Sequence, residues 1–420
     1  MHAVHHGGMS NSDFGRGPAR TAAEGLRPGD PGYRRALVAV LFAGLASFQA
    51  LYCTQALLPV FVDELRVDPA TAALTVSATT GALAVAVVPV SVLSERFGRR
   101  PVLLAAAVSA TALGFLVALA PGAPAVILLR GLQGLLVAGV PAVAMTYVAE
   151  EVHQEHVPTV MGLYISGTTV GGLLGRIIPS VVLEFAGWRV ALAASAAVAF
   201  AFALATWRLL PRQRRFAPKS LTLAGEGAAI ARHLRDPRLL GLYVLAFLFM
   251  GAFVSLYNYL GFRLSDRFGL SPALAGFVFL LYLAGTFGSA RAGGWARRTG
   301  RRRLIAVSVA AACAGLALTA LPHLGALLAG VALFTGAFFV AHSLSSSAVG
   351  LVARADRAEA SSMYLFSYYA GSSVIGWVSG HVFEGAGWAG FVPWLAALSL
   401  VAGAAALYGL RGIAEPRRAD

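Results

Sequence analysis

Long apolar stretches, separated by short polar breaks, follow one another along most of the 420-residue chain. Each is long enough for a transmembrane helix, which needs about 20 predominantly apolar residues. Twelve stretches can be delimited, at 36–62, 72–94, 101–120, 124–148, 158–184, 188–210, 239–262, 272–295, 304–322, 324–351, 359–383 and 387–410. The pattern predicts an all-α membrane protein with twelve transmembrane helices.

The longest polar interruption, at 211–238, divides these helices into two sets of six. We therefore predict an N-terminal six-helix bundle at 36–210 and a C-terminal six-helix bundle at 239–411, joined by a cytoplasmic central loop. The polar ends of the chain are predicted to be cytoplasmic tails, a disordered one at 1–35 and a short one at 412–420.

The two sets of helices also share sequence features at a nearly constant offset, which is typical of duplicated transporter halves. The matching positions are Leu51-Tyr52 with Leu256-Tyr257, Gly98-Arg99-Arg100 with Gly300-Arg301-Arg302, and Tyr164 and Gly171 with Tyr364 and Gly371. The offsets are 205, 202 and 200 residues. This agreement predicts two parallel, pseudo-symmetric bundles.

Composition excludes several classes of protein. Of all residues, 58% are hydrophobic and 12% are charged, whereas a soluble domain carries about 25% charged residues. The net charge of +14 indicates loops that face anionic membrane lipid rather than nucleic acid. The only lysine, Lys219, follows a proline, so a phosphate-binding Gly-Lys-Ser/Thr loop is excluded. The spans hold no catalytic constellation, so we expect neither an enzyme nor a cofactor or metal site.

The distribution of basic residues predicts the orientation. If both termini lie inside, 27 of the 33 basic residues fall on the cytoplasmic side and 4 on the external side. The two that remain, Arg130 and Arg176, lie within spans. We therefore predict a multi-pass protein of a bacterial cytoplasmic membrane with both termini in the cytoplasm.

Two related motifs follow the second and eighth spans. Ser91 to Arg100 resembles the loop signature of the major facilitator superfamily, G-x-L-x-D-R-x-G-R-R/K, and 293–302 resembles a degenerate second copy. Ser91 and Arg297 depart from the signature, as does Glu95, which replaces an aspartate. The resemblance implies a gating motif made of Glu95, Arg96, Gly98, Arg99, Arg100, Gly293, Arg297, Arg298, Gly300 and Arg301. We expect Glu95 to latch the two halves; the alternative is a basic loop that only fixes topology.

Further motifs support the resemblance. Arg130 and Gln133 in the fourth span match the superfamily's R-x-x-Q-G signature, which implies proton coupling or substrate binding. The fifth span resembles the glycine-rich antiporter signature, but Arg176 occupies its proline position. Runs such as 161–167 and 364–373 are similar to the YnfM-type inner-membrane transporters, a bacterial branch of the superfamily.

The resemblance implies a secondary transporter, acting as a monomer, that exports a small organic solute or drug by alternating access. Proton coupling is an open part of this hypothesis. One alternative is uptake or uniport of an organic anion. Another, from a different class, is a membrane-embedded sensor that binds a solute without transporting it.

Ionisable residues inside a membrane are functional candidates because burying their charge is costly. Arg130 and Arg176 are predicted at similar depth, and no acidic residue lies near the middle of a span. This pattern suggests a cavity that attracts an anion or a carboxylate-bearing substrate. The structural alternative is that each arginine caps backbone carbonyls or reaches Asp63 or Glu184.

Other polar residues in the spans complete the candidate site. His342 can relay a proton, because histidine titrates near neutral pH, or can simply pack with a hydrogen bond. Residues of mixed aromatic and polar character are expected to line the cavity, namely Tyr52, Gln55, Tyr147, Tyr164, Tyr257, Asn258, Tyr368 and Tyr369.

Overall fold

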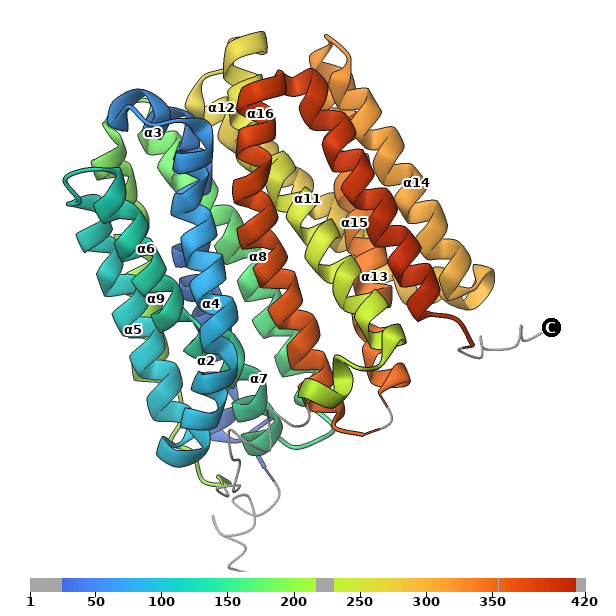
Figure 1. Ribbon diagram of the computed structural model, residues 1–420. Coiled ribbons are helices and arrows are strands. Elements are labelled where there is room, and N and C mark those ends of the chain that lie inside the picture. The colour runs from blue at the N-terminus through green and yellow to red at the C-terminus, as the bar shows by residue number, and fades with distance from the viewer. Residues whose placement is uncertain (1–24, 217–229, 354, 413–420) are drawn as a thin grey trace, which may run out of the picture.

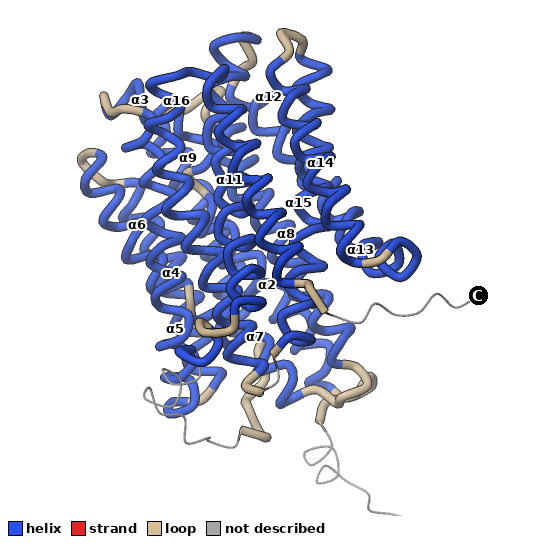
Figure 2. The backbone as a smooth tube through the Cα atoms, turned by 45° about the vertical axis from the view of Figure 1, so that its right-hand side comes forward, coloured by secondary structure: helices blue, strands red, loops and turns tan. Residues whose placement is uncertain are grey.

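The computed structural model describes residues 25–216, 230–353 and 355–412, which form helices and no named strand. Figure 2 shows these helices joined by short loops. The predicted all-α membrane fold is confirmed. Parts of the predicted tails and central loop lie outside the described residues, namely 1–24, 217–229 and 413–420.

The N-terminal half contains the first six spans (Figure 1). Its elements are α2 (Pro31–Tyr52), η1 (Gln55–Leu57), α3 (Leu58–Leu65), α4 (Pro69–Phe97), α5 (Arg99–Ala118), α6 (Ala123–Val137), α7 (Gly139–Glu151), α8 (Val157–Val182) and α9 (Trp188–Leu209). The first span combines α2, η1 and α3, and the fourth combines α6 and α7. The first helix begins at Pro31, five residues before the predicted start, because proline is favourable at the first position of a helix.

The C-terminal half repeats this arrangement. Its elements are α11 (Pro237–Phe268), α12 (Pro272–Phe277), η2 (Val278–Leu281), α13 (Tyr282–Thr299), α14 (Arg301–Ala320), α15 (Leu324–Val352) and α16 (Arg357–Gly409). Eleven helical segments of the described chain are long and apolar enough to cross a membrane. However, α16 has a non-helical Gly387, with φ 57° and ψ −165°, at which it reverses direction in Figure 1. Since α16 thus supplies two spans, the described residues contain the twelve spans that the sequence predicts.

The internal repeat is visible in the backbone. Gly98 has φ 91° and ψ 153°, and Gly300 has φ 85° and ψ 142°. Side-chain-bearing residues rarely adopt these angles, so both motif glycines are required where one span turns into the next. Gly171 and Gly371, another matched pair, each lie against a carbonyl of the first helix of their own half. Close helix packing therefore explains part of the glycine-rich fifth span.

The two halves stand side by side, with α4 and α8 next to the C-terminal half (Figure 1). The main contacts across this boundary join α4 to α16 and α8 to α12. The ends of the bundle differ: α3 and α12 lie at the upper end in Figure 1 and α7 at the lower end. We refer to these as the predicted external and predicted cytoplasmic ends.

Candidate functional site

Arg176 of α8 lies at the boundary between the halves, and only 2% of it is exposed. Its Nε donates to Oε1 of Gln55 at 2.7 Å, and Nη1 donates to the carbonyl of Gly172 at 2.7 Å. Nη2 donates to the hydroxyl of Tyr282, in the other half, at 3.1 Å. The guanidinium therefore joins the halves through neutral groups.

Aromatic rings surround the same guanidinium. Its Cζ lies 4.1 Å from the ring centre of Tyr52, 4.7 Å from that of Tyr282 and 5.0 Å from that of Phe279. A cation over a ring face at such distances is attracted by the ring quadrupole. These contacts make the buried charge tolerable without a carboxylate, and they draw on both halves.

A second polar contact crosses the boundary beside Arg176. Nε2 of Gln55 donates to Oδ1 of Asn258 in α11 at 2.7 Å. Asn258 is 1% exposed, and its Nδ2 has no hydrogen-bond partner among the described residues. Gln55 and Asn258, both predicted to line the cavity, thus meet directly, and one amide donor remains available.

Further rings extend this site into the C-terminal half. These rings form a series in which each contacts the next, with distances measured between ring centres. Tyr282 lies 6.3 Å from Phe339, which lies 5.2 Å from Phe338. Phe338 lies 5.7 Å from His342, which lies 4.8 Å from Tyr368. Tyr368 packs against the buried cluster that contains Tyr52, whose ring lies beside Arg176. We name this set the aromatic collar: Tyr52, Tyr282, Phe338, Phe339, His342 and Tyr368.

His342 belongs to the collar and to a hydrogen-bonded pair. Its Nδ1 lies 3.0 Å from the hydroxyl oxygen of Tyr364, and its ring stacks on Phe338 at an interplanar angle of 12°. The side chain is half-buried. It is therefore held in a fixed position on the collar, which serves either a proton relay or simple packing.

Arg130 occupies a different environment, inside the N-terminal half and fully buried. Nη1 donates to the carbonyl of Ala50 at 2.6 Å and to Gln133 at 2.5 Å, while Nη2 donates to the carbonyl of Leu51. Nε donates to the carbonyl of Thr75 at 2.9 Å. Ala50 and Leu51 lie in the last turn of α2, where carbonyls lack helical partners. This geometry corresponds to the structural alternative for Arg130.

The remaining predicted lining residues occupy varied positions. Tyr257 lies 4.6 Å from Tyr282 between ring centres, and its hydroxyl is 2.8 Å from Thr335. Tyr369 contacts Tyr368 at the collar. Six of the eight predicted lining residues are thus at or beside the site, namely Tyr52, Gln55, Tyr257, Asn258, Tyr368 and Tyr369. Others are farther from it: the hydroxyl of Tyr147 donates to the carbonyl of Pro211 at 3.0 Å, and Tyr164 is buried within the N-terminal half.

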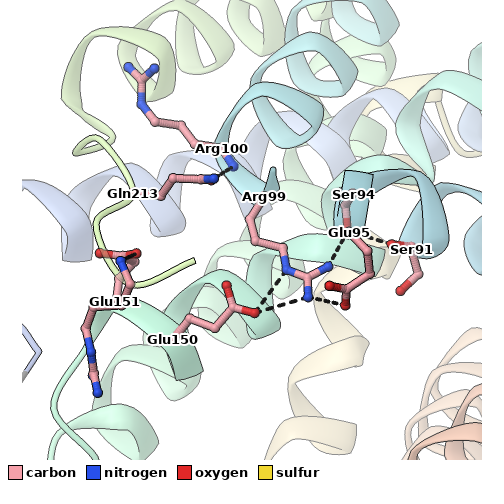
Figure 3. A network of polar contacts seen from close by, with 9 residues as sticks. Ser91, Ser94, Glu95, Arg99, Arg100, Glu150, Glu151 and Gln213 are labelled. Atoms are coloured by element: carbon pink, nitrogen blue, oxygen red, sulfur yellow. Dashed lines mark hydrogen bonds and ion pairs between the residues drawn. The ribbon is translucent and has the colours of Figure 1, made fainter. Parts of the chain in front are cut away.

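The first motif loop forms an ionic cluster at the predicted cytoplasmic end (Figure 3). Arg99 pairs with Glu95, four residues earlier, and with Oε1 of Glu150 at 3.1 Å. Its Nη1 also donates to Ser94 at 2.5 Å. Arg96 is exposed beside the ring of Phe97. The cluster links the second, third and fourth spans of the N-terminal half, and its predicted role as a latch between halves stays a prediction.

Neighbouring residues join this cluster to the central loop. The backbone N–H of Arg100 donates to Oε1 of Gln213 at 2.8 Å, and its Nε donates to the carbonyl of Leu210 at 3.0 Å. Oε1 of Glu151 accepts the backbone N–H groups of Arg214 and Arg215 at 2.8 Å each. The start of the central loop is therefore fixed against the N-terminal half.

The second motif loop has similar backbone geometry but different partners. Arg301 follows Gly300 as Arg99 follows Gly98, and its Nη1 lies 3.4 Å from the carbonyl of Leu344 in α15. Arg297 and Arg298 are exposed at the end of α13, near Gly293 in sequence. Because Arg297 replaces the acidic residue of the motif, Arg301 contacts a backbone carbonyl where Arg99 contacts carboxylates.

The boundary between the halves is closely packed toward the predicted external end. Gly276 of α12 lies against the side chain of Ser180, and Gly380 of α16 lies against the backbone of Ala70. A methyl group on either glycine would overlap the opposite half. At the other end, a cavity of about 130 Å³ lies between α4, α7 and α16, lined by Val87, Val88, Ser91, Val92, Pro141, Ala142, Ser362 and Leu365.

Sequence reasoning missed Tyr282, Phe279, Phe338 and Phe339. All four lie in apolar runs, where aromatic residues are ordinary packing. One signal was available for two of them, because Phe338 and Phe339 precede His342 by four and three residues and so share its helix face.

Comparison with known proteins agrees with this arrangement. The sequence profile of the Major Facilitator Superfamily matches residues 40–374. The inner membrane transport protein YnfM of Escherichia coli (strain K12) is 38% identical over 378 residues, 90% of this chain and 91% of that protein. The MFS-type transporter YybF of Bacillus subtilis (strain 168) is 35% identical over 378 residues, 90% of this chain and 94% of that protein.

Solved structures share the fold. The crystal structure of a D-xylose-proton symporter superposes with a TM-score of 0.68 at 17% identity, covering 91% of this chain and 98% of that one. The crystal structure of the nucleoside transporter NupG gives 0.67 at 15% identity, covering 90% and 98%. With the profile match and the relatives above, these likenesses show that the chain belongs to the major facilitator superfamily and is a multi-pass membrane transporter.

Proposed function

We propose that this protein is a secondary active exporter of a small organic solute in a bacterial cytoplasmic membrane, working as a monomer by alternating access. The observation that carries the proposal is the boundary around Arg176. It is tightly packed at the predicted external end, at Gly276 and Gly380, while a cavity of about 130 Å³ lies at the opposite end. This asymmetry is what a state that receives solute from the cytoplasm requires.

None of the hydrogen bonds described across the boundary is an ion pair, which suits a boundary that opens and closes. When the halves move apart, Gln55 loses its bond to Asn258 and Arg176 loses its bond to Tyr282. Each donor can then bond to another neutral group. A neutral bond such as Gln55 to Asn258 contributes about 1 kcal/mol to stability and a bond with a charged donor about 1.5–3 kcal/mol, so a rocking motion can break them.

The proposed orientation places both termini and the central loop in the cytoplasm, where the basic loops face anionic lipid. Reporter fusions at Arg235 and at Asp420 should both indicate the cytoplasm. A periplasmic signal from either fusion would reverse the orientation and, with it, the direction of transport.

Proton antiport is the proposed coupling, and His342 is its proposed proton carrier because its imidazole lies in the aromatic collar and is hydrogen-bonded to the hydroxyl of Tyr364. The test is flux of a panel of labelled organic solutes into inside-out vesicles, with and without an imposed pH gradient. We expect accumulation of at least one solute that collapses when the gradient is removed. Accumulation that is the same with and without the pH gradient would refute proton coupling but not transport.

The alternative is uptake or uniport of an organic anion, and the neutral surroundings of the Arg176 cation support an anionic solute in either direction. Right-side-out vesicles distinguish it from export. Accumulation in those vesicles alone would establish uptake. Binding without flux in either orientation would instead favour a solute sensor.

A further inference from the structure

We propose that Arg176 and the aromatic collar bind a flat organic monoanion, most simply an aromatic monocarboxylate. The inference rests on the proposed transport function, and it specifies the substrate class of that same site. It holds for either direction of transport.

The first argument is charge. The partners described for Arg176 are an amide, a backbone carbonyl, a phenol and three rings, all neutral. In the described helices, acidic residues lie near a helix end or near the reversal of α16: Asp63, Glu64, Glu95, Glu150, Glu151, Asp266, Glu359 and Glu384. Arg130 is already occupied by backbone carbonyls. Arg176 is therefore the buried cation in the spans that can pair with an anionic ligand.

The second argument is the balance of donors and acceptors. A guanidinium has five N–H groups, and three hydrogen bonds are described for Arg176. Nδ2 of Asn258, linked to Arg176 through Gln55, adds a buried donor without a partner among the described residues. Buried donors without partners are costly. The site is thus rich in donors, and a ligand that brings acceptor oxygens, such as a carboxylate, offsets this excess.

The third argument is shape. Tyr282, Phe339, His342 and Tyr368 are only half-buried, although they lie among fully buried aromatic neighbours such as Phe253 and Tyr257. Partly accessible rings in a protein interior offer faces and edges on which a flat apolar body can stack. The collar therefore favours an aromatic ligand, while Arg176 fixes the position of its charged group.

The same features exclude other charge classes. A cation would be repelled by Arg176 at low dielectric. While His342 is neutral, a dianion would bury a second charge for which the site offers no second cation, and an unpaired buried charge is strongly unfavourable. A neutral analogue would keep the stacking but lose the charge-assisted hydrogen bonds, which are about twice as strong as neutral ones. The site therefore prefers a single negative charge.

The test is equilibrium binding to the purified full-length protein in lipid nanodiscs, measured by calorimetry. The probes are benzoate and naphthoate, with naphthamide as the neutral match, naphthylmethylamine as the cation, naphthalene dicarboxylate as the dianion and octanoate as the anion without a ring. We expect one of the aromatic monocarboxylates to bind at least about tenfold more tightly than every other class.

Two variants assign that binding to Arg176. Arg176→Gln should weaken binding of the preferred acid about tenfold or more, because it removes the charge while keeping a polar side chain. Arg189→Gln makes the same change in net charge at the predicted external surface and should leave binding unchanged. Equal affinity for acid and amide, binding of neither acid, or full binding by the Arg176→Gln variant would each overturn the proposal.

Flux measurements separate this inference from the proposed function. If naphthoate binds through Arg176 but no solute crosses the vesicle membrane, the substrate class stands and the transport proposal fails. If a cation or neutral solute is transported equally well by the wild-type and Arg176→Gln proteins, transport stands and the substrate class is refuted.

Discussion

The two intramembrane arginines, Arg130 and Arg176, lie in the same half of the molecule, yet their surroundings differ. Arg130 is enclosed within the N-terminal half and donates to carbonyls of two helices and to Gln133. Arg176 lies at the boundary with the other half, among aromatic rings and neutral side chains. The residue type is the same, so the neighbouring helices distinguish the two positions.

The two arginines differ in which carbonyl groups lose a hydrogen-bond donor when the side chain is replaced. The carbonyls of Ala50 and Leu51 lie in the last turn of α2 and need a donor from outside the helix. The carbonyl of Gly172 lies within α8, four residues before Arg176, where the backbone N–H of a helix already provides a donor. We therefore propose that Arg130 supports the fold and that Arg176 has the functional role.

The largest expected effect follows from Arg130→Gln. The shorter neutral side chain cannot reach all the carbonyls, and each unsatisfied buried group costs about 1–3 kcal/mol. Folded yield and melting temperature in detergent should fall strongly, with flux per folded molecule preserved. A stable variant without flux would contradict the comparison by giving Arg130 the functional role.

Arg176→Gln should have the opposite profile. Its stability should fall less than that of Arg130→Gln, because the carbonyl of Gly172 keeps its helical donor and only Oε1 of Gln55 and the hydroxyl of Tyr282 lose a described partner. Flux should fall about tenfold or more when a charge-assisted contact to solute is lost. Melting temperature and vesicle flux are measured on the same preparation, with Arg189→Gln as the charge-matched control. Reduced stability with normal flux would make the two arginines equivalent.

Arg176→Lys should give an intermediate result. Lysine keeps the positive charge but lacks the planar fork that contacts Gln55 and Tyr282 together. We expect flux between those of wild type and Arg176→Gln, with a raised KM for the transported solute. Full activity would show that charge alone is sufficient at this position.

The smallest expected effect concerns Glu184, which follows α8 and contacts α12 of the other half. Its Oε1 accepts the backbone N–H of Ala273 at 2.7 Å, and this bond lowers the pKa of the carboxyl from its ordinary value. A lowered pKa means that the contact stabilises the closed boundary above the ordinary pKa of about 4.3 and is lost as pH falls through the folded-state pKa.

Glu184→Gln should therefore slightly loosen the external boundary and remove this acid dependence. A cysteine introduced at Ser180 reports opening near Arg176 through its rate of thiol labelling between pH 3 and pH 6, roughly spanning the carboxyl titration. The Sγ atom of native Cys53 lies 3.5 Å from Nη1 of Arg130, so this thiol reports on the surroundings of Arg130. It should stay protected from labelling. Equal changes at both cysteines would indicate general unfolding rather than boundary opening.

Much of the fold could be predicted because its determinants are local in sequence. Twelve apolar stretches specify twelve spans, and the offset of about 200 residues, seen for Gly171 and Gly371, predicts equivalent packing in both halves. Gly98 and Gly300 mark the turns, since their backbone angles require glycine. These properties depend on short segments and do not require knowledge of which helices touch.

The site was only partly predictable because it depends on long-range neighbours. The sequence identified Arg130, Arg176, Gln55, Asn258 and His342 as polar residues in apolar spans. It placed Tyr147 among the lining residues, whereas the tertiary structure places it against the start of the central loop. Tyr282 was missed because a tyrosine in an apolar run carries no periodic signal of its own.

Hydropathy and repetition by themselves thus determined the spans, the two halves and the presence of buried cations. The tertiary structure decided which cation is enclosed by carbonyls and which faces the boundary. The physical reason is that burying an apolar side chain lowers the free energy against almost any apolar neighbour, whereas a guanidinium requires particular acceptors at hydrogen-bonding distance. Those acceptors come from helices distant in sequence, such as α2 for Arg130 and α13 for Arg176.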